Sequence, residues 1–193
     1  MPKMKLFLVR HGETKENVAG ILMGHHHGVL TEKGKAQAKE TAMVLKDYKF
    51  AHIYSSDLNR CIDTAEFIKE FHPDTPLTFT KELRELNMGA FQGQMTSSVD
   101  WDSLFSDEVN GKAEGGESLS ELKTRALDFV RQLYERHTSE NILLVTHGGW
   151  IAQVISHFAR VPSRDIFGKI GNAQVFEVEV GKDLTGKVLN LNQ

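Results

Sequence analysis

Two histidine–glycine pairs in this chain each follow a short apolar run. The first is His11-Gly12, which comes after Arg10 and residues 6–9, and the second is His147-Gly148, which comes after residues 141–146. Apolar runs of this length predict buried strands. Ligands of open α/β sheets bind at the carboxyl ends of the strands. If the two strands are neighbours, both imidazoles lie at one edge of the sheet.

Arginines close to these histidines indicate phosphate chemistry. Arg10 directly precedes His11, and Arg60 follows a third strand-like segment, residues 52–55, in the first turn of a predicted helix. Neutral imidazole can attack phosphorus, and the guanidinium group is a forked donor that always carries charge. A cluster of Arg10, His11, Arg60 and His147 is costly without an anion, and a phosphoryl group would satisfy it.

Strand and helix patterns alternate along the chain and must position this cluster. Thr31 is a predicted helix N-cap, and Ser118-Leu119-Ser120-Glu121 matches a capping box, so helices are expected after both. The other predicted helices span 58–71 and 149–158, and the predicted strands are 5–9, 52–55, 78–79, 141–146, 174–180 and 186–191, the last two as a hairpin. The alternation predicts one α/β sandwich with a mainly parallel sheet.

Residues 84–117 interrupt the alternation. The segment is irregular and rich in glycine, and one short helix is expected near residues 97–105. We expect residues 1–193 to form a single domain, with residues 94–117 as a lid-like insertion over the site.

Composition narrows the class of protein. The 193 residues are 40% hydrophobic and 25% charged, as in ordinary soluble domains, and the formal net charge of -3 argues against general affinity for nucleic acid or acidic membranes. Residues 6–9 are too few to span a bilayer. The single cysteine, Cys61, allows no internal disulfide, and we expect a cytoplasmic protein.

Three other features have competing interpretations. His25-His26-His27 invites a metal site, but consecutive residues of a loop cannot all face one ion without strain, so we expect no metal and a loop at the rim of the pocket. Cys61 lacks the arginine six residues further on that a cysteine phosphatase needs, since Phe67 stands there, and it is interpreted as a small buried side chain. Trp150 is either a core residue or one packed beside the pocket.

Taken together, the motifs resemble those of the histidine phosphatase superfamily, which includes the cofactor-dependent phosphoglycerate mutases. The similarity covers nearly the whole chain. It is carried, in order, by Arg10-His11-Gly12-Glu13-Thr14 with Asn17, Leu30-Thr31-Glu32-Lys33-Gly34 with Gln37-Ala38, Ser55-Ser56-Asp57-Leu58 with Arg60 and Thr64-Ala65, Glu85 with Gly89 and Gly93, Gly116-Glu117-Ser118, and Thr146-His147-Gly148-Gly149. Arg-His-Gly alone is a weak motif, whereas this set in this order is specific.

The resemblance implies a three-layer α/β/α sandwich with a mostly parallel mixed sheet. His11 would be the nucleophile that becomes a phosphohistidine. The residues that hold the phosphate oxygens would be Arg10, Arg60 and His147, assisted by Asn17 and the backbone near Gly148. Met23-Gly24 would offer backbone contacts to the substrate.

The resemblance also implies no metal ion or organic cofactor, and a small phosphorylated metabolite as the substrate. A homodimer stays open, because related proteins include dimers and monomers.

Glu85 lies four residues before Gly89, where the family places its proton donor. Glu82 competes for this role, but the spacing favours Glu85, and Glu13 is interpreted as a residue that caps a helix or orients its neighbours. A carboxylic acid stays protonated at neutral pH only where burial or nearby negative charge favours that form. The apolar residues expected to surround Glu85 are Leu86, Met88 and Phe91.

The resemblance leaves the reaction open between hydrolysis and phosphoryl transfer to a second substrate. A mutase needs extra cations for its anionic ligand, but residues 94–117 are acidic, with Asp100, Asp102, Asp107, Glu108, Glu114 and Glu117 against Lys112. The chain also lacks the mutases' longer insertion and paired arginines, and Met88 stands where a tyrosine is usual. We therefore expect a phosphomonoester hydrolase, with a phosphoglycerate mutase as the alternative. A non-catalytic phospholigand-binding protein is disfavoured, because His11 and Glu85 are both present.

Overall fold

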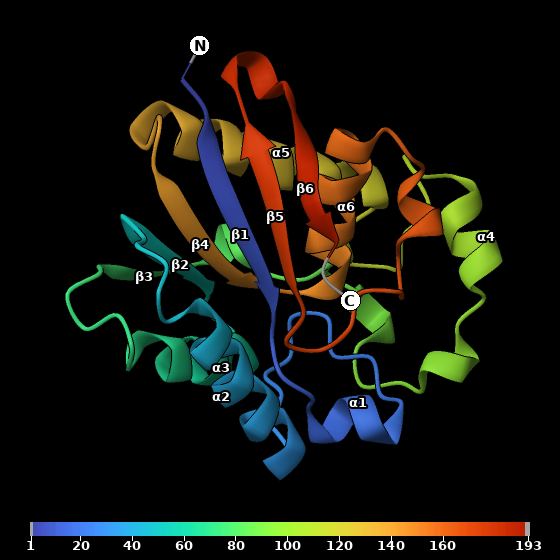
Figure 1. Ribbon diagram of the computed structural model, residues 1–193. Coiled ribbons are helices and arrows are strands. Elements are labelled where there is room, and N and C mark those ends of the chain that lie inside the picture. Colours follow the sequence, from blue (N-terminus) through green and yellow to red (C-terminus); the bar gives the residue numbers. More distant parts are fainter. Residues whose placement is uncertain (1, 192–193) are drawn as a thin grey trace.

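A mixed sheet forms the centre of the molecule (Figure 1). The computed structural model describes residues 2–191, and within them the sheet has six strands in the order β3-β2-β4-β1-β5-β6. The strands are β1 (Met4–Arg10), β2 (His52–Ser56), β3 (Leu77–Thr80), β4 (Asn141–Thr146), β5 (Val175–Val180) and β6 (Gly186–Leu191). All six strand predictions are confirmed, with bounds that differ by at most one residue at either end.

Pairing of β1 with β4 brings the two histidines together. The strands are parallel, and Arg10 is the partner of Thr146, so His11 and His147 both follow the last paired residues. β4 also pairs in parallel with β2, and β2 with β3. β5 and β6 pair antiparallel as the predicted hairpin, with β5 antiparallel to β1. The predicted, mainly parallel sheet is confirmed.

Helices cover both faces of this sheet (Figure 1). The α-helices are α1 (Lys15–Ala19), α2 (Glu32–Leu45), α3 (Asn59–Lys69), α4 (Trp101–Ser106), α5 (Leu119–Arg136) and α6 (Gly148–Ala159). Leu6 and Leu8 pack in one apolar cluster with α5 and α6, while Phe7 and Val9 pack in a second one with α2 and α3. Because both faces are covered, the central strands are continuous apolar runs, and the three-layer sandwich is confirmed.

Local signals set the helix starts. The side chain of Thr31 accepts the Gly34 amide at the start of α2, and Ser118 forms the predicted capping box with Glu121 at the start of α5. The N-cap of α6 is His147, whose backbone is extended and whose side chain makes no cap hydrogen bond. That imidazole is therefore directed elsewhere, and α6 begins one residue earlier than predicted.

The segment between β3 and α5 is irregular, as expected. It contains α4 and three short 3-10 helices, Lys81–Leu83, Gly89–Phe91 and Thr96–Ser98; two further 3-10 helices are Ser163–Asp165 and Lys182–Leu184. Figure 1 shows α4 set apart from the sheet. The Phe105 ring lies 5.3 Å from that of Trp101 and 5.0 Å from that of Phe167, which connects α4 to the segment after α6. The lid function of residues 94–117 stays a prediction.

Trp150 belongs to the core. Its side chain is fully buried in the apolar cluster that α5 and α6 form with the sheet. Its Nε1 donates to the carbonyl oxygen of Glu82 at 3.0 Å. Of the two interpretations of Trp150, the core one is therefore confirmed. Among residues 2–191, no helix combines the length and the apolar character needed to cross a bilayer.

Two glycines let the loop after β1 touch the start of α2. A Cβ atom on Gly34 would lie 2.0 Å from the carbonyl oxygen of Glu13, and one on Gly12 would lie 2.3 Å from that of Gly34. Both distances are far below van der Waals contact, and both involve backbone atoms. A side chain at either position would push the loop that carries His11 away from the helix.

We expect Gly34→Ala to lower the free energy of unfolding by about 1–3 kcal/mol, because the added methyl group overpacks this contact. Helix propensity alone predicts the opposite, a gain of about 1 kcal/mol. Urea unfolding measures the sign of the change in the free energy of unfolding. Glu40→Ala, an exposed change on the same helix, is the control and should stay within about 0.5 kcal/mol of the wild type. A Gly34→Ala protein more stable than the wild type would contradict the packing argument.

Candidate active site

His11 is a buried neutral imidazole at the end of β1. It is 2% exposed, and its Nδ1 donates to the carbonyl oxygen of Gly12 at 2.8 Å. Burial lowers the pKa of His11 well below its ordinary value, and the positive charges of Arg60 and Arg10 lower it further. In the neutral form the proton therefore stays on Nδ1, and the lone pair of Nε2 is available to attack an electrophile.

His147, which follows the last residue of β4, lies close to His11. Its ring centroid is 5.3 Å from that of His11, and burial and the charge of Arg60 lower its pKa well below the ordinary value. Nδ1 accepts from Nε of Arg60 at 3.2 Å, and Nε2 forms a hydrogen bond of 2.9 Å with Oγ of Ser56. Both ring nitrogens thus have protein partners. A direct hydrogen bond from His147 to phosphate therefore requires one of the two nitrogens to give up its protein partner.

Arg60 is buried at the start of α3 and holds the neighbouring loop. Its Nη1 donates to the carbonyl oxygen of His26 at 2.6 Å, and its Nη2 donates to that of Gly24 at 2.9 Å. A guanidinium has five N–H groups. With Nε directed at His147, one N–H on each Nη is left over for an anion.

Arg10 supplies a second, partly buried cation. Nη1 donates to the carbonyl oxygen of Ile170, while Nε, also buried, has no partner among the described residues. A Cβ atom on Gly148 would lie 3.5 Å from this Nε, so the guanidinium group lies against the first residue of α6. Buried donors are normally satisfied, and a helix N-terminus favours anions. A phosphate oxygen at this position would satisfy both groups.

Glu85 is held by backbone amides. Its Oε1 accepts from the amide of Leu86 at 2.8 Å, and its Oε2 accepts from that of Gly149, at the start of α6, at 3.0 Å. The carboxylate interacts electrostatically with both Arg10 and Arg60. Leu86 and Met88 are buried as expected, and Phe91 is partly buried, but amides rather than an apolar wall contact the carboxylate oxygens.

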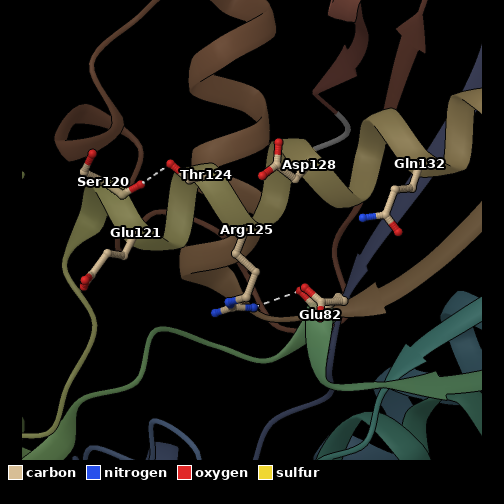
Figure 2. A pocket seen from close by; sticks show the side chains of 7 residues that line it. All are labelled: Glu82, Ser120, Glu121, Thr124, Arg125, Asp128 and Gln132. Carbon is tan, nitrogen blue, oxygen red and sulfur yellow. Dashed lines mark hydrogen bonds between the residues drawn. The ribbon is translucent and has the colours of Figure 1, made fainter.

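The competing residue Glu82 is exposed and lines a groove beside α5, drawn in Figure 2. Glu13 accepts from Thr31 Oγ1 at 2.9 Å and forms an ion pair with Lys33, so it orients the start of α2.

Burial raises the pKa of Cys61 to about 12, which keeps it a thiol; the interpretation as a small buried side chain is confirmed.

The loop with three consecutive histidines contacts the site through different groups. His25 Nε2 donates to the carbonyl oxygen of Glu85 at 2.8 Å, His26 uses its backbone carbonyl, and His27 Nδ1 accepts from the Asn59 amide at 3.2 Å. The three imidazoles therefore do not converge. In the part of the chain that the structure describes, no three acidic, cysteine or histidine side chains are grouped as metal ligands would be.

Sequence reasoning missed the segment before β5. Asn172 Nδ2 donates to the carbonyl oxygen of His11 at 3.2 Å and to Oδ1 of Asn17 at 3.3 Å. The same Oδ1 accepts from the Thr14 amide as part of the capping box of α1, and Met23 Sδ accepts from the hydroxyl of Thr14. Asn17 and Met23 therefore border the site, whereas no motif pointed to Asn172.

Comparison with known proteins identifies the family of the chain. A profile of the histidine phosphatase superfamily (branch 1) matches residues 6–192. Phosphoglycerate mutase-like protein 4 of Arabidopsis thaliana is 33% identical over 179 residues, which are 89% of this chain and 77% of that protein. The metal-independent phosphoserine phosphatase of the same plant is 33% identical over 181 residues, 89% of this chain and 74% of that protein.

Among solved structures, a mycobacterial glucosyl-3-phosphoglycerate phosphatase in complex with VO3 superposes with a TM-score of 0.85 and 27% identity, covering 97% of this chain and 98% of that one. The chain belongs to the histidine phosphatase superfamily, which confirms the resemblance inferred from its motifs.

We expect the free energy of unfolding to fall as the pH is lowered from about 7.5 to about 5.5, and to fall less steeply in His11→Gln. Because the folded-state pKa of His11 lies below that of the unfolded chain, about 6.5, the unfolded state binds more protons in this range. Stability is therefore lost on acidification, by up to about 1.4 kcal/mol per pH unit for one such histidine.

Urea unfolding at several pH values, in buffers without phosphate, measures the two slopes. His26→Gln, which removes an exposed imidazole from the neighbouring loop, is the matched control. Equal slopes for His11→Gln and the wild type would refute the lowered pKa of His11.

Proposed function

We propose that this protein is a phosphomonoester hydrolase that transfers the phosphoryl group of a small metabolite to Nε2 of His11 and then to water. The observation that carries the proposal is the buried His11 imidazole, whose Nδ1–H is bound to Gly12 and which lies close enough to the positive charges of Arg10 and Arg60 for both to lower its pKa. Phosphoryl transfer depends mostly on positioning and on stabilisation of charge.

In the first step the Nε2 lone pair of His11 attacks phosphorus, and the bond from phosphorus to the ester oxygen breaks. Arg10 and Arg60 hold the phosphate oxygens, aided by the amides at the start of α6 near Gly148. Glu85 gives its proton to the departing oxygen. In the second step water attacks the phosphorus of the phosphohistidine and the bond from phosphorus to Nε2 breaks, returning its electron pair to the imidazole. Glu85 takes a proton from that water, and inorganic phosphate leaves.

The surroundings of the site favour water as the acceptor. Residues 94–117, which we propose as a lid over the site within a single domain, carry a negative balance of charge that repels a doubly phosphorylated ligand. Arg84, the cation beside Glu85 in the sequence, is occupied by Asp57 in two hydrogen bonds of 2.6 Å. A phosphoglycerate mutase is the second candidate, since one relative is named as a phosphoglycerate mutase-like protein.

A panel of phosphorylated metabolites that includes phosphoserine and both monophosphoglycerates distinguishes the two reactions. Release of inorganic phosphate supports the hydrolase. Interconversion of the phosphoglycerates without phosphate release would overturn it in favour of the mutase.

We expect His11→Asn to lower phosphate release from the best substrate by at least about 10³-fold, because the variant has no imidazole to accept the phosphoryl group. Rapid quenching of the wild-type protein at alkaline pH, where phosphohistidine survives, followed by peptide mass spectrometry, should find the modification at His11. His26→Asn is the control. Assays run with and without EDTA should agree; loss of activity in EDTA, or turnover that persists in His11→Asn, would refute the mechanism.

We expect Glu85→Gln to lower kcat/KM by about 10²–10⁴-fold for an alkyl phosphate such as phosphoserine, and much less for p-nitrophenyl phosphate. The alkoxide leaving group needs the proton, whereas nitrophenolate leaves without it. The ratio kcat/KM reports only the steps up to the first phosphoryl transfer, so a change in the hydrolysis of the phosphohistidine does not enter. Equal losses on both esters would exclude Glu85 as the proton donor.

A further inference from the structure

The backbone around Glu85 has no regular structure to fix it. Glu85 follows the short 3-10 helix Lys81–Leu83 directly after Arg84, and residues 84–88 belong to no helix or strand. A proton donor must nevertheless keep its carboxyl group within hydrogen-bond reach of the reacting oxygen. The segment therefore needs support from outside its own backbone.

Arg125 on α5 supplies the largest part of that support, beside single hydrogen bonds from His25 to the carbonyl oxygen of Glu85 and from Trp150 to that of Glu82. Its Nη1 donates to the carbonyl oxygens of Glu82 and Arg84 at 2.8 and 2.9 Å, and its Nη2 donates to that of Glu85 at 3.1 Å. Figure 2 shows the side chain extending from α5 to Glu82. One guanidinium group thus binds three carbonyls of the segment that ends at Glu85.

Glu117 fixes the guanidinium group in turn. Its Oε1 accepts from Nε of Arg125 at 2.9 Å, and its Oε2 accepts from Nη2 at 2.8 Å. With these two bonds, all five N–H groups of Arg125 have acceptors. The side chains are only 19% and 15% exposed, so solvent competes little for these bonds.

Glu117 also holds the residues that follow Glu85. Its Oε2 accepts from the Asn87 amide at 3.2 Å, and its backbone amide donates to the Asn87 carbonyl at 2.8 Å. The chain is therefore held on both sides of Glu85, by Arg125 before it and by Glu117 after it. The side-chain carboxylate of Glu85 is itself held by two hydrogen bonds, from the backbone amides of Leu86 and Gly149.

We infer that Arg125 is a positioning residue for the reaction: through its bonds to the backbone of residues 82–85, it keeps the Glu85 carboxyl group where it can protonate the leaving oxygen. The inference rests on the proposed role of Glu85 as proton donor. A displacement of about 1 Å is enough to cost about 10²-fold in rate. The planar fork of arginine suits a site with several acceptors, and lysine cannot reproduce it.

The test compares Arg125→Gln with Glu85→Gln on two esters, phosphoserine and p-nitrophenyl phosphate. If Arg125 acts through Glu85, kcat/KM of Arg125→Gln falls by about 10–100-fold on phosphoserine and by less than about 3-fold on p-nitrophenyl phosphate. In the double variant Arg125→Gln/Glu85→Gln, phosphoserine turnover is no lower than in Glu85→Gln, because the group being positioned is already gone.

Two further variants complete the set. Arg131→Gln is the matched control, since Arg131 is an exposed arginine on the same helix whose hydrogen bond is to Asp128, and it should change neither ester. Arg125→Lys should keep the charge and recover only part of the loss. Should Arg125→Gln not fold, Arg125→Lys carries the same comparison between the two esters.

Each outcome has one meaning. The inference is overturned if Arg125→Gln lowers kcat/KM equally on both esters, or if the two losses add in the double variant. Arg125 would then have only a structural role. If Glu85→Gln itself shows no difference between the esters, the proposed proton donor fails, and the inference fails with it. A loss confined to phosphoserine and absent from the double variant supports both.

Discussion

Two guanidinium groups at the carboxyl edge of the sheet, one buried and one partly buried, are the constraint on which the rest of the site depends. Arg10 and Arg60 bring positive charge into a place where two imidazoles are also buried, and their charge and the burial together keep His11 and His147 neutral. A neutral imidazole is a nucleophile, whereas a protonated one is not. The same two charges would hold the phosphate oxygens, so one arrangement both activates the nucleophile and binds its target.

These arginines also connect chain segments that no sheet or helix holds. Arg60 binds the carbonyls of the loop at residues 24–26, and Arg10 binds that of Ile170. Arg125 does the same for the residues before Glu85. A guanidinium group suits this task, because its five donors match the carbonyl oxygens that irregular backbone leaves without partners. The loops around the site are therefore fixed by side chains that regular elements carry.

Much of the fold and half of the site could be predicted because their signals are local. A buried strand needs a run of apolar residues, and a helix start needs a capping side chain; both are present in the sequence at β1, β4, α2 and α5. His11 and His147 could be placed together because each follows such a strand, and parallel neighbours end at one edge. The short helix α1 has the capping side chain of Thr14 but no apolar pattern, since its five residues contribute nothing to the core.

The sequence by itself determined the layers of the sandwich, the strand ends that carry His11 and His147, and the residue types suited to phosphoryl transfer. Only the tertiary structure decided which atoms these residues bind. Arg10 meets a carbonyl 160 residues away, and Arg125 meets one 40 residues away. Every residue has a carbonyl group, so an acceptor of this kind leaves no mark in the sequence. The proton on Nδ1 of His11, the bond from Asn172 and the hold on Glu85 all depend on such carbonyls, and for this physical reason they appear only once the chain has folded.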